Sequence, residues 1–261
     1  MTDDRPEIRT ETKGRARWIW IEREDRRNAM NKRVVAGIER AVIAAAEDPA
    51  IRAIVLTGAG QRAFCAGADL SGGTDTFILG LDEPKTDFGR LARTMREIGI
   101  PTIARVNGDC VAGGMGLMAM CDLAVAADHA RFGLPEAKVG VFPMQVLVFL
   151  RGMIGARAIN ELCLTGAFID AARAREIGLV NHVVPFAELD ARVEALMASL
   201  REMSPVAMRR GKYAIAAMAG MGFAEALAFA ETSIAVTSLT SDATEGLAAF
   251  NARRKPRWTA D

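Results

Sequence analysis

The chain is poor in the side chains that most often carry polar chemistry. Its 261 residues include two histidines, one tyrosine and four cysteines. The cysteines form no Cys-x-x-Cys pair and the histidines no His-x-x-x-His spacing, so the sequence predicts no metal site. Four scattered cysteines, three of them in apolar surroundings, are typical of reduced core residues in a cytosolic protein.

The chain also lacks an excess of charge and a long apolar run. Its 33 Lys and Arg residues balance 32 Asp and Glu residues, so the charge gives no electrostatic sign of nucleic-acid binding. No apolar run reaches the roughly 18 residues that a membrane span needs. Residues 1–16 are charged throughout and lack the apolar segment of a signal peptide. We therefore expect a cytoplasmic protein with neither nucleic-acid nor membrane partners.

The remaining pattern is that of a globular α/β protein. Short apolar runs alternate with segments of helical spacing, which favours a largely parallel sheet. The expected strands are 18–21, 53–57, 102–106 and 123–127, and the expected helices are 31–47, 88–98 and 113–121.

The texture changes near residue 155. Six further helices are expected, at 156–164, 170–177, 187–202, 205–218, 223–238 and 241–253, with one extended run at 180–184. This predicts a frayed N-terminus over 1–14, a core over 15–190 and a helical C-terminal region over 191–261. The apolar faces of the last helices need a surface to pack on, and part of it could be another subunit.

Two glycine-bearing segments stand at ends of expected strands. The first covers residues 63–70 and the second covers residues 107–116, where a strand leads into a helix. Glycines at such junctions let the backbone approach a ligand and leave N–H groups unpaired. A helix N-terminus adds partial positive charge that suits an anion. Such turns are also common without a ligand, so both interpretations stay open on this pattern alone.

Competing motifs are absent. The glycines at 113, 114 and 116 lack the spacing of a dinucleotide fingerprint, and no Gly-Lys-Ser/Thr follows them. There is no Gly-x-Ser-x-Gly elbow for a serine nucleophile. We expect His129 to be an exposed turn residue and His182 to have a structural role in its extended run.

Taken in order, the motifs of this chain resemble those of the crotonase superfamily of enoyl-CoA hydratases and isomerases. The matching residues are 27–30 (Arg-Asn-Ala-Met), 64–70, 107–108 with 112–114, 121–122, 132–136, 164–166, 171–172, 177–180 and 253–256. The resemblance spans roughly residues 15–258. It implies a spiral of β-β-α units with a helical C-terminal trimerisation region, in a homotrimer or hexamer. It also implies an acyl-CoA thioester as substrate, with coenzyme A as part of that substrate and no separate cofactor.

The resemblance assigns roles to ten residues. The backbone N–H groups of Ala68 and Gly113 would stabilise the negative charge on the thioester oxygen, and Glu136 would be the catalytic acid or base. The residues expected along the substrate and its coenzyme A are Arg27, Ala29, Ala66, Gly67, Asp69, Leu70 and Gly114. Two of these have open alternatives, a solvated turn charge for Arg27 and a helix N-cap for Asp69.

One position departs from the family pattern. Hydratases of this family usually hold water between two glutamates, and the second would stand where this chain has Gly116. A single carboxylate can still move a proton between two carbons, as in a double-bond isomerase. A carboxylate from the expected mobile loop 71–87, which contains Asp75, Asp82 and Glu83, could also reach the site. The apolar residues Met115, Met118 and 143–147 are either core or an acyl pocket.

Several functions therefore remain open within this fold. The leading expectation is an enoyl-CoA hydratase-like lyase or an isomerase that stabilises a thioester enolate. A hydrolase or decarboxylase would use the same fold. A catalytically degenerate acyl-CoA-binding protein would keep the fold without the chemistry.

Overall fold

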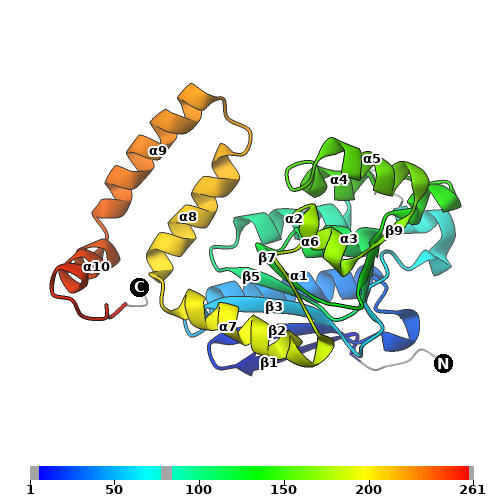
Figure 1. The fold of residues 1–261 in the computed structure, drawn as a ribbon, viewed down its shortest axis with the longest axis horizontal. Coiled ribbons are helices and arrows are strands. Elements are labelled where there is room, and N and C mark those ends of the chain that lie inside the picture. The colour runs from blue at the N-terminus through cyan, green and yellow to red at the C-terminus, as the bar shows by residue number, and fades with distance from the viewer. Residues whose placement is uncertain (1–5, 78–83, 259–261) are drawn as a thin grey trace.

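The computed structural model describes residues 6–77 and 84–258, which form an α/β body and a helical C-terminal region (Figure 1). The central sheet has six strands in the order β1-β2-β3-β5-β7-β10. Their bounds are β1 Ile8–Lys13, β2 Ala16–Ile21, β3 Ala53–Gly58, β5 Thr102–Val106, β7 Leu123–Ala127 and β10 His182–Val184. Only the β1–β2 pair is antiparallel. The strands β3 and β5 are buried on both faces, as expected for parallel strands covered on both sides.

A smaller sheet of short strands lies beyond the end of the main one. Its order is β4-β6-β8-β9, with bounds β4 Ala63–Cys65, β6 Asp109–Val111, β8 Arg131–Gly133 and β9 Phe168–Asp170. The pairs β4–β6 and β6–β8 are parallel, and β9 runs antiparallel to β8. This sheet brings together the chain segments that follow the larger strands β3, β5 and β7.

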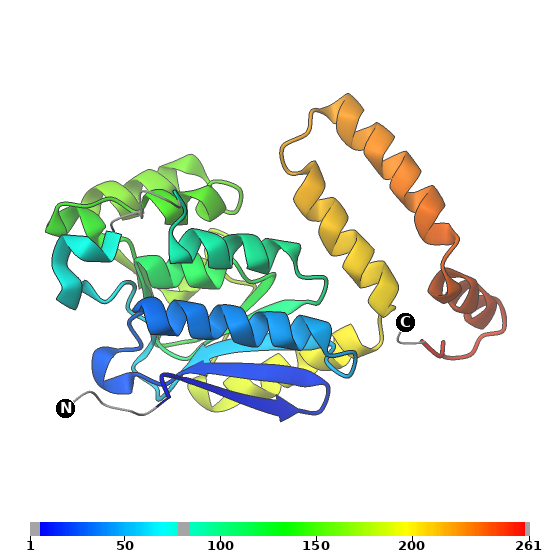
Figure 2. The same ribbon diagram turned by 180° about the vertical axis from the view of Figure 1, so that it is seen from behind.

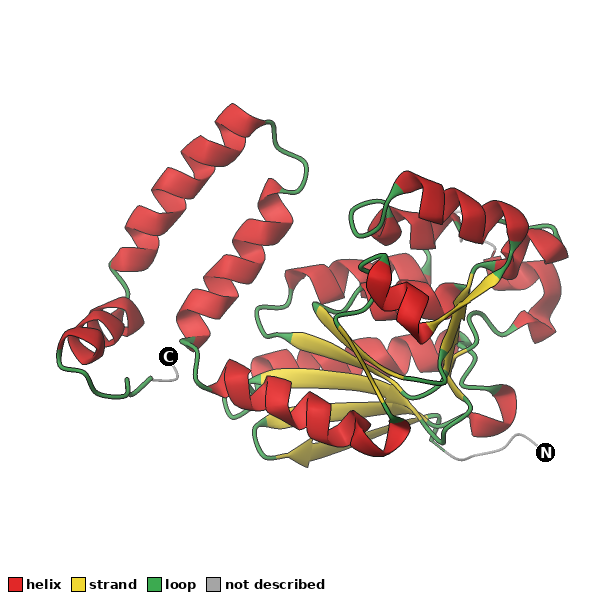
Figure 3. Ribbon diagram, in the orientation of Figure 1, coloured by secondary structure: helices red, strands yellow, loops and turns green. Residues whose placement is uncertain are grey.

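Helices cover both faces of the main sheet (Figure 3). The body contains α1 Lys32–Glu47, α2 Asp87–Glu97, α3 Gly113–Ala119, α4 Met144–Leu150, α5 Ala156–Thr165, α6 Ala171–Glu176 and α7 Leu189–Arg201. Short 3-10 segments are η1 Glu24–Arg26, η2 Leu70–Phe77, η3 Pro135–Val139 and η4 Phe186–Glu188. One core packs β2 and β3 side chains against α1, α2 and α3. A second core packs the opposite face, including Trp18 and Trp20, against α7.

The C-terminal helices extend away from this body. They are α8 Pro205–Met218, α9 Phe223–Ser238 and α10 Ser241–Asn251, and Figure 2 shows the α8–α9 hairpin projecting from the body. Lys212 on α8 reaches the body through the Asp122 carboxylate (2.6 Å) and the Ile100 carbonyl (3.0 Å). Neither α8 nor α9, both described in full, buries a residue. The C-terminal region therefore leaves apolar surface uncovered in a single chain.

The structure bears on two segments whose conformation was expected from the sequence, the N-terminus and the loop 71–87. Residues 8–13 are not frayed, because they pair with β2 over the register from Ile8↔Ile21 to Lys13↔Ala16. In the expected mobile loop 71–87, residues 70–77 form η2. Asp82 and Glu83, which were expected to be able to reach the site, lie outside the described residues, as does the side chain of Asp75. In the described ranges, no helix combines the length and apolar character needed to cross a membrane.

Candidate active site

Backbone hydrogen bonds join two of the segments that the sequence marked. The Ala66 N–H donates to the Arg27 carbonyl at 3.1 Å. The Met30 N–H donates to the Gly67 carbonyl at 2.7 Å, and the Asp69 N–H donates back to Met30 at 2.8 Å. The predicted substrate-binding residues of segments 27–30 and 66–70 therefore lie side by side, although 39 positions separate Ala66 from Arg27 in the sequence.

The nitrogens of Ala68 and Gly113 meet where this strip contacts α3. A β-carbon built on Gly113 would lie 3.7 Å from the Ala68 nitrogen, and one built on Gly67 would lie 3.2 Å from the Gly113 nitrogen. Gly67 has a φ of +93°, which other residues adopt rarely. Neither the Ala68 nor the Gly113 N–H donates a hydrogen bond to another of the residues that the structure describes. Both donors are therefore available to an oxygen atom from outside the chain.

Close packing fixes the start of α3. The residue before it, Ala112, has φ +52° and ψ −127°, a region that nearly always holds glycine. Its N–H donates to the Gly133 carbonyl at 2.9 Å. A β-carbon on Gly114 would lie 2.2 Å from the Cys65 carbonyl oxygen, so glycine is needed there for α3 to approach β4. The Gly113 nitrogen is thus held from two sides by the small sheet.

Glu136 follows the same strand, β8, three residues after Gly133. Its side chain is half-buried, and the Oε2 atom is buried with no hydrogen-bond partner within residues 6–77 and 84–258. Burial raises the pKa of the Glu136 carboxyl, against an opposing hydrogen bond from its own backbone. The neighbouring Cys163 thiol has its pKa raised to about 11 by burial and by the charge of Glu136. A carboxyl in such surroundings suits acid–base catalysis near neutral pH.

The position of the missing second glutamate is occupied by apolar atoms. A β-carbon on Gly116 would lie 2.9 Å from the Phe88 ring at Cζ and 3.1 Å from Val146 Cγ2. Met115 and Met118 belong to the buried core, whereas Met144 is 67% exposed. Val146, which is 4% exposed, belongs to the same core, so the packing supports the core alternative for Met115, Met118 and Val146. No motif of the sequence marks Phe88, a single aromatic residue in the first turn of α2.

The remaining predicted binding residues divide by environment. The Asp69 carboxylate pairs with Arg23 at 2.8 Å and accepts the Ser71 N–H at 3.1 Å. Burial opposes ionisation, yet the hydrogen bonds from Arg23 and Ser71 lower the pKa of Asp69 to about 2. This geometry supports the capping alternative. The Arg27 side chain is exposed, Leu70 is 48% exposed, and Ala29 and Ala66 are half-buried.

The scarce polar side chains lie elsewhere. His129 is exposed and contacts the Gln61 carbonyl at 3.0 Å, while His182 lies in β10 beside Arg192. The exposure of His129 confirms its expected place, and the position of His182 in β10 agrees with a structural role. All four cysteines are buried free thiols. In the described part of the chain, no group of three or more His, Cys, Asp or Glu residues could hold a metal ion.

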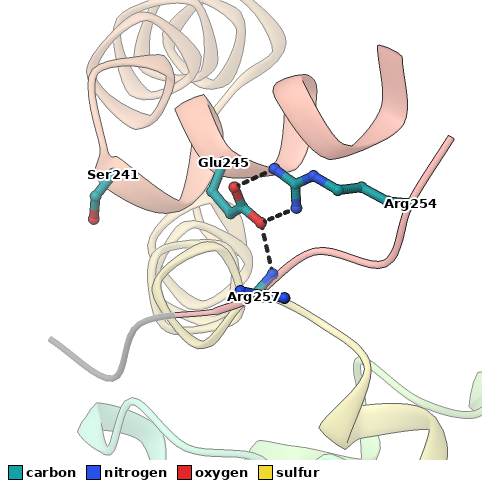
Figure 4. A pocket seen from close by; sticks show the side chains of 4 residues that line it. All are labelled: Ser241, Glu245, Arg254 and Arg257. Atoms are coloured by element: carbon teal, nitrogen blue, oxygen red, sulfur yellow. Dashed lines mark hydrogen bonds and ion pairs between the residues drawn. The ribbon is translucent and has the colours of Figure 1, made fainter. Parts of the chain in front are cut away.

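A surface hollow of about 520 Å³ lies far from this site, on the C-terminal helices. It is lined by Ser241, Glu245, Arg254 and Arg257 (Figure 4). Arg254 donates to both Glu245 oxygens, at 2.6 and 2.8 Å, and the Arg257 N–H adds a third bond at 2.7 Å. These bonds lower the pKa of Glu245 to about 2. The cluster fastens the end of the chain to α10.

Comparisons with known proteins agree with this geometry. A family model described as "Enoyl-CoA hydratase/isomerase" matches residues 12–261. "Probable enoyl-CoA hydratase echA8" of Mycobacterium bovis is 36% identical over 242 residues, covering 92% of this chain and 93% of that protein. "Crotonyl-CoA hydratase" of Syntrophomonas wolfei is 32% identical over 243 residues, covering 91% and 92%.

A solved structure extends the agreement to three dimensions. The crystal structure of an enoyl-CoA hydratase from Mycobacterium smegmatis superimposes with a TM-score of 0.89 at 32% identity. The match covers 97% of this chain and 99% of that one, so it includes the C-terminal helices as well as the body. The predicted α/β fold with a helical C-terminal region is thereby confirmed.

Proposed function

Because the chain belongs to the enoyl-CoA hydratase/isomerase family of acyl-CoA enzymes, we propose that it stabilises a thioester enolate through two backbone N–H groups. The donors are Ala68 and Gly113. An enolate forms when a proton leaves the α-carbon of the thioester, or when a nucleophile adds to the β-carbon of a 2-enoyl thioester. Either way, negative charge gathers on the carbonyl oxygen.

The unpaired state of the two donors supports this role. Their nitrogens lie in one small region, and neither N–H is used by another described residue. Donors that are fixed before the reaction need no rearrangement as charge develops, and removing one typically costs about 3 kcal/mol of transition-state stabilisation. The partial positive charge at the start of α3 is small because that helix is short, so the N–H groups themselves carry most of the effect.

Glu136 is the proposed acid–base group. In its ionised form it takes a proton from the substrate carbon, and in its protonated form it returns one, so the carboxyl ends each cycle unchanged. The single observation that carries the proposal is the buried and unpartnered Oε2 of Glu136, which lies three residues after Gly133, the residue whose carbonyl accepts the N–H of Ala112 next to Gly113. No electron is transferred in such a step, so the reaction requires no cofactor besides the coenzyme A of the substrate.

The strip formed by segments 27–30 and 66–70 is the proposed contact for coenzyme A. Its exposed Arg27 guanidinium suits a phosphate group, and its half-buried Ala29 and Ala66 leave room for a ligand against the backbone. Asp69 contributes indirectly, because its ion pair with Arg23 holds the strip in place: Arg23 also donates to the Ala29 carbonyl at 2.7 Å.

A double-bond isomerase is the second candidate, and the environment of Gly116 favours it. The relatives in the comparison carry the names of hydratases, yet hydration in this family usually engages two glutamates, and Phe88 and Val146 occupy the second position here. One carboxylate suffices to remove a proton from the α-carbon and deliver it to the γ-carbon. Turnover of 3-enoyl-CoA compared with hydration of crotonyl-CoA separates the two activities.

Glu136→Gln tests the acid–base role directly. We expect the variant to bind acyl-CoA normally and to lose at least about a hundredfold in the exchange of α-protons with deuterium oxide, since general acid–base groups typically contribute 10²–10⁴-fold. Exchange is followed by NMR and binding by calorimetry. Glu161→Gln on the neighbouring helix α5 is the control, because Glu161 is exposed and its substitution leaves exchange unchanged.

The outcomes divide the open alternatives. Unchanged exchange in Glu136→Gln contradicts the assignment of Glu136. Tight binding of acyl-CoA with no exchange in the native protein indicates a degenerate acyl-CoA-binding protein. Release of free coenzyme A or of carbon dioxide indicates a hydrolase or a decarboxylase.

Self-association completes the proposal. The exposed apolar side chains of α8, α9 and α10 support a homotrimer or hexamer built through the C-terminal region.

A further inference from the structure

Three helices converge on the α-carbon of Gly116. Phe88 comes from the first turn of α2, Val146 comes from α4, and Gly116 lies in the middle of α3. Both neighbours approach within 3.1 Å of the place where a β-carbon would stand. Val146 is 4% exposed, and Phe88 packs against the same core cluster. We call Phe88 and Val146 the apolar plug.

Side-chain hydrogen bonds hold the two halves of the plug together. The Thr86 hydroxyl caps α2 by accepting the Gly89 N–H at 2.9 Å. The same oxygen accepts a bond from the Gln145 amide at 2.5 Å. Thr86 lies two residues before Phe88, and Gln145 lies directly before Val146. The start of α2 is therefore tied to the start of α4 where the two apolar side chains meet.

A second acid at 116 would have to displace the plug, and the plug offers no hydrogen bond to the water that such an acid would hold. A glutamate at 116 would need its β-carbon within 2.9 Å of the Phe88 ring. A buried water needs about three hydrogen bonds to polar groups, and an aromatic ring and a valine methyl offer none. A carboxylate forced into such surroundings would also lose its hydration without compensation.

We propose that Phe88 and Val146 are specificity-determining residues, which restrict the site to proton transfer between substrate carbons by excluding water from the side of Gly116. The inference rests on the proposed function of Glu136. It adds that Phe88 and Val146 determine whether this carboxylate catalyses isomerisation or hydration. Because side chains from α2 and α4 pack against Gly116 of α3, a glutamate at 116 needs space that the plug occupies. Changing Gly116 alone should therefore not give hydration.

The first test introduces a glutamate at position 116, with and without a second substitution that makes space for it. Gly116→Glu alone is expected to show no gain in crotonyl-CoA hydration. The double variant Gly116→Glu with Phe88→Ala is expected to raise the ratio of hydration to 3-enoyl-CoA isomerisation at least about tenfold over Gly116→Glu, the lower end of what an acid–base group supplies. An equal gain in Gly116→Glu alone overturns the inference, because it shows that the plug excludes nothing.

The second test needs no charged residue and keeps the inference falsifiable if the double variant does not fold. Val146→Ala opens the plug from α4, whereas Val148→Ala makes the same change on the same helix at a side chain that is 60% exposed. We expect the ratio of hydration to isomerisation to rise at least about threefold in Val146→Ala, a modest share of the roughly tenfold or greater discrimination that one buried methyl group can give. No change is expected in Val148→Ala, and equal ratios in both variants overturn the inference.

Exchange of the α-proton separates the two levels of argument. It depends on Glu136 and the backbone donors but not on water at Gly116. If the native protein exchanges the α-proton but no plug variant changes the ratio of hydration to isomerisation, only the role of Phe88 and Val146 is overturned, and the proposed function stands. Exchange that is absent in the native protein overturns the proposed function and this inference together.

Discussion

At the scale of single residues, the Glu136 carboxyl sets a pH dependence of the reaction. Burial raises its pKa above the ordinary value of about 4.3. A base must be ionised to take a proton, so activity should fall on the acid side with a midpoint above that ordinary value. The midpoint is read from kcat/KM for 3-enoyl-CoA isomerisation between pH 4 and pH 8. A midpoint at or below the ordinary glutamate value contradicts the environment assigned to Glu136.

The same shift has a consequence for stability with a definite sign. A carboxyl whose pKa is higher in the folded state binds more protons when folded, so its contribution is fully present below the ordinary pKa and is lost as the pH rises through the raised one. Glu136→Gln removes the titration. The difference in unfolding free energy, variant minus native, should therefore grow as the pH rises from 4 to 7 in urea titrations. Exposed Glu161→Gln provides the baseline.

Single residues also show where prediction from sequence stops. Ala68, Gly113 and Glu136 could be named because ordered motifs surround them, and the structure places the two nitrogens together. Phe88 carries no such motif: it is one aromatic residue at the start of a helix. Its position beside Gly116 depends on the tertiary packing that brings the first turn of α2 near α3, and no periodicity of the sequence encodes that packing. Asp69, in contrast, lies in a motif, but its role was ambiguous because helix capping and ligand binding both use a carboxylate.

At the scale of elements, the junction between β6 and α3 stores backbone strain. Ala112 holds φ +52° and ψ −127° directly before Gly113. Such a conformation costs an alanine about 1–3 kcal/mol and glycine much less, whereas glycine adds about 0.4–1 kcal/mol of unfolded-state entropy. Ala112→Gly should therefore stabilise the protein by about 1 kcal/mol in urea denaturation. The extra freedom at Gly113 should at the same time reduce α-proton exchange.

The matched control makes the same change at an ordinary backbone conformation. Ala219, the exposed C-cap of α8, has φ −59° and ψ −19°. Ala219→Gly relieves no strain and should destabilise the protein slightly. If both variants lose stability to the same extent, the positive φ of Ala112 costs the fold nothing and the strain argument is wrong.

Elements with a strong pattern were predictable. The buried strands at 53–57, 102–106 and 123–127 and the helix at 31–47 were expected within one or two residues of β3, β5, β7 and α1, because burial on one face or both imposes an apolar pattern. The strand β1 was missed because five of its six residues are polar and exposed. Strands of three residues, such as β4 and β6, are too short for any period to show.

At the scale of the whole molecule, the C-terminal region of a single chain exposes a large apolar surface. Its helices carry large apolar side chains that face solvent. The most exposed are Phe223 (85%), Leu239 (84%), Phe250 (80%), Ile215 (73%), Tyr213 (67%) and Ile234 (67%). The amphipathic pattern behind these helices was visible in the sequence, whereas the partner surface was not, because a chain's own sequence does not specify which of its faces meet in an assembly. Exposure on this scale supports the proposed self-association.

This exposure predicts the effect of charge on assembly. We expect the native protein to sediment at three or six times its 28.0 kDa chain mass. A buried phenylalanine or leucine contributes about 2 kcal/mol, which is roughly a thirtyfold change in association per contact, and a charge in its place also loses hydration. Phe223→Glu with Leu239→Glu should therefore shift the mass toward a single chain in analytical ultracentrifugation. Ile43→Glu, at a 40% exposed position on α1, is the control. A native protein that sediments as one chain would refute the assembly, and a double variant of native mass would place the interface elsewhere than on these two side chains.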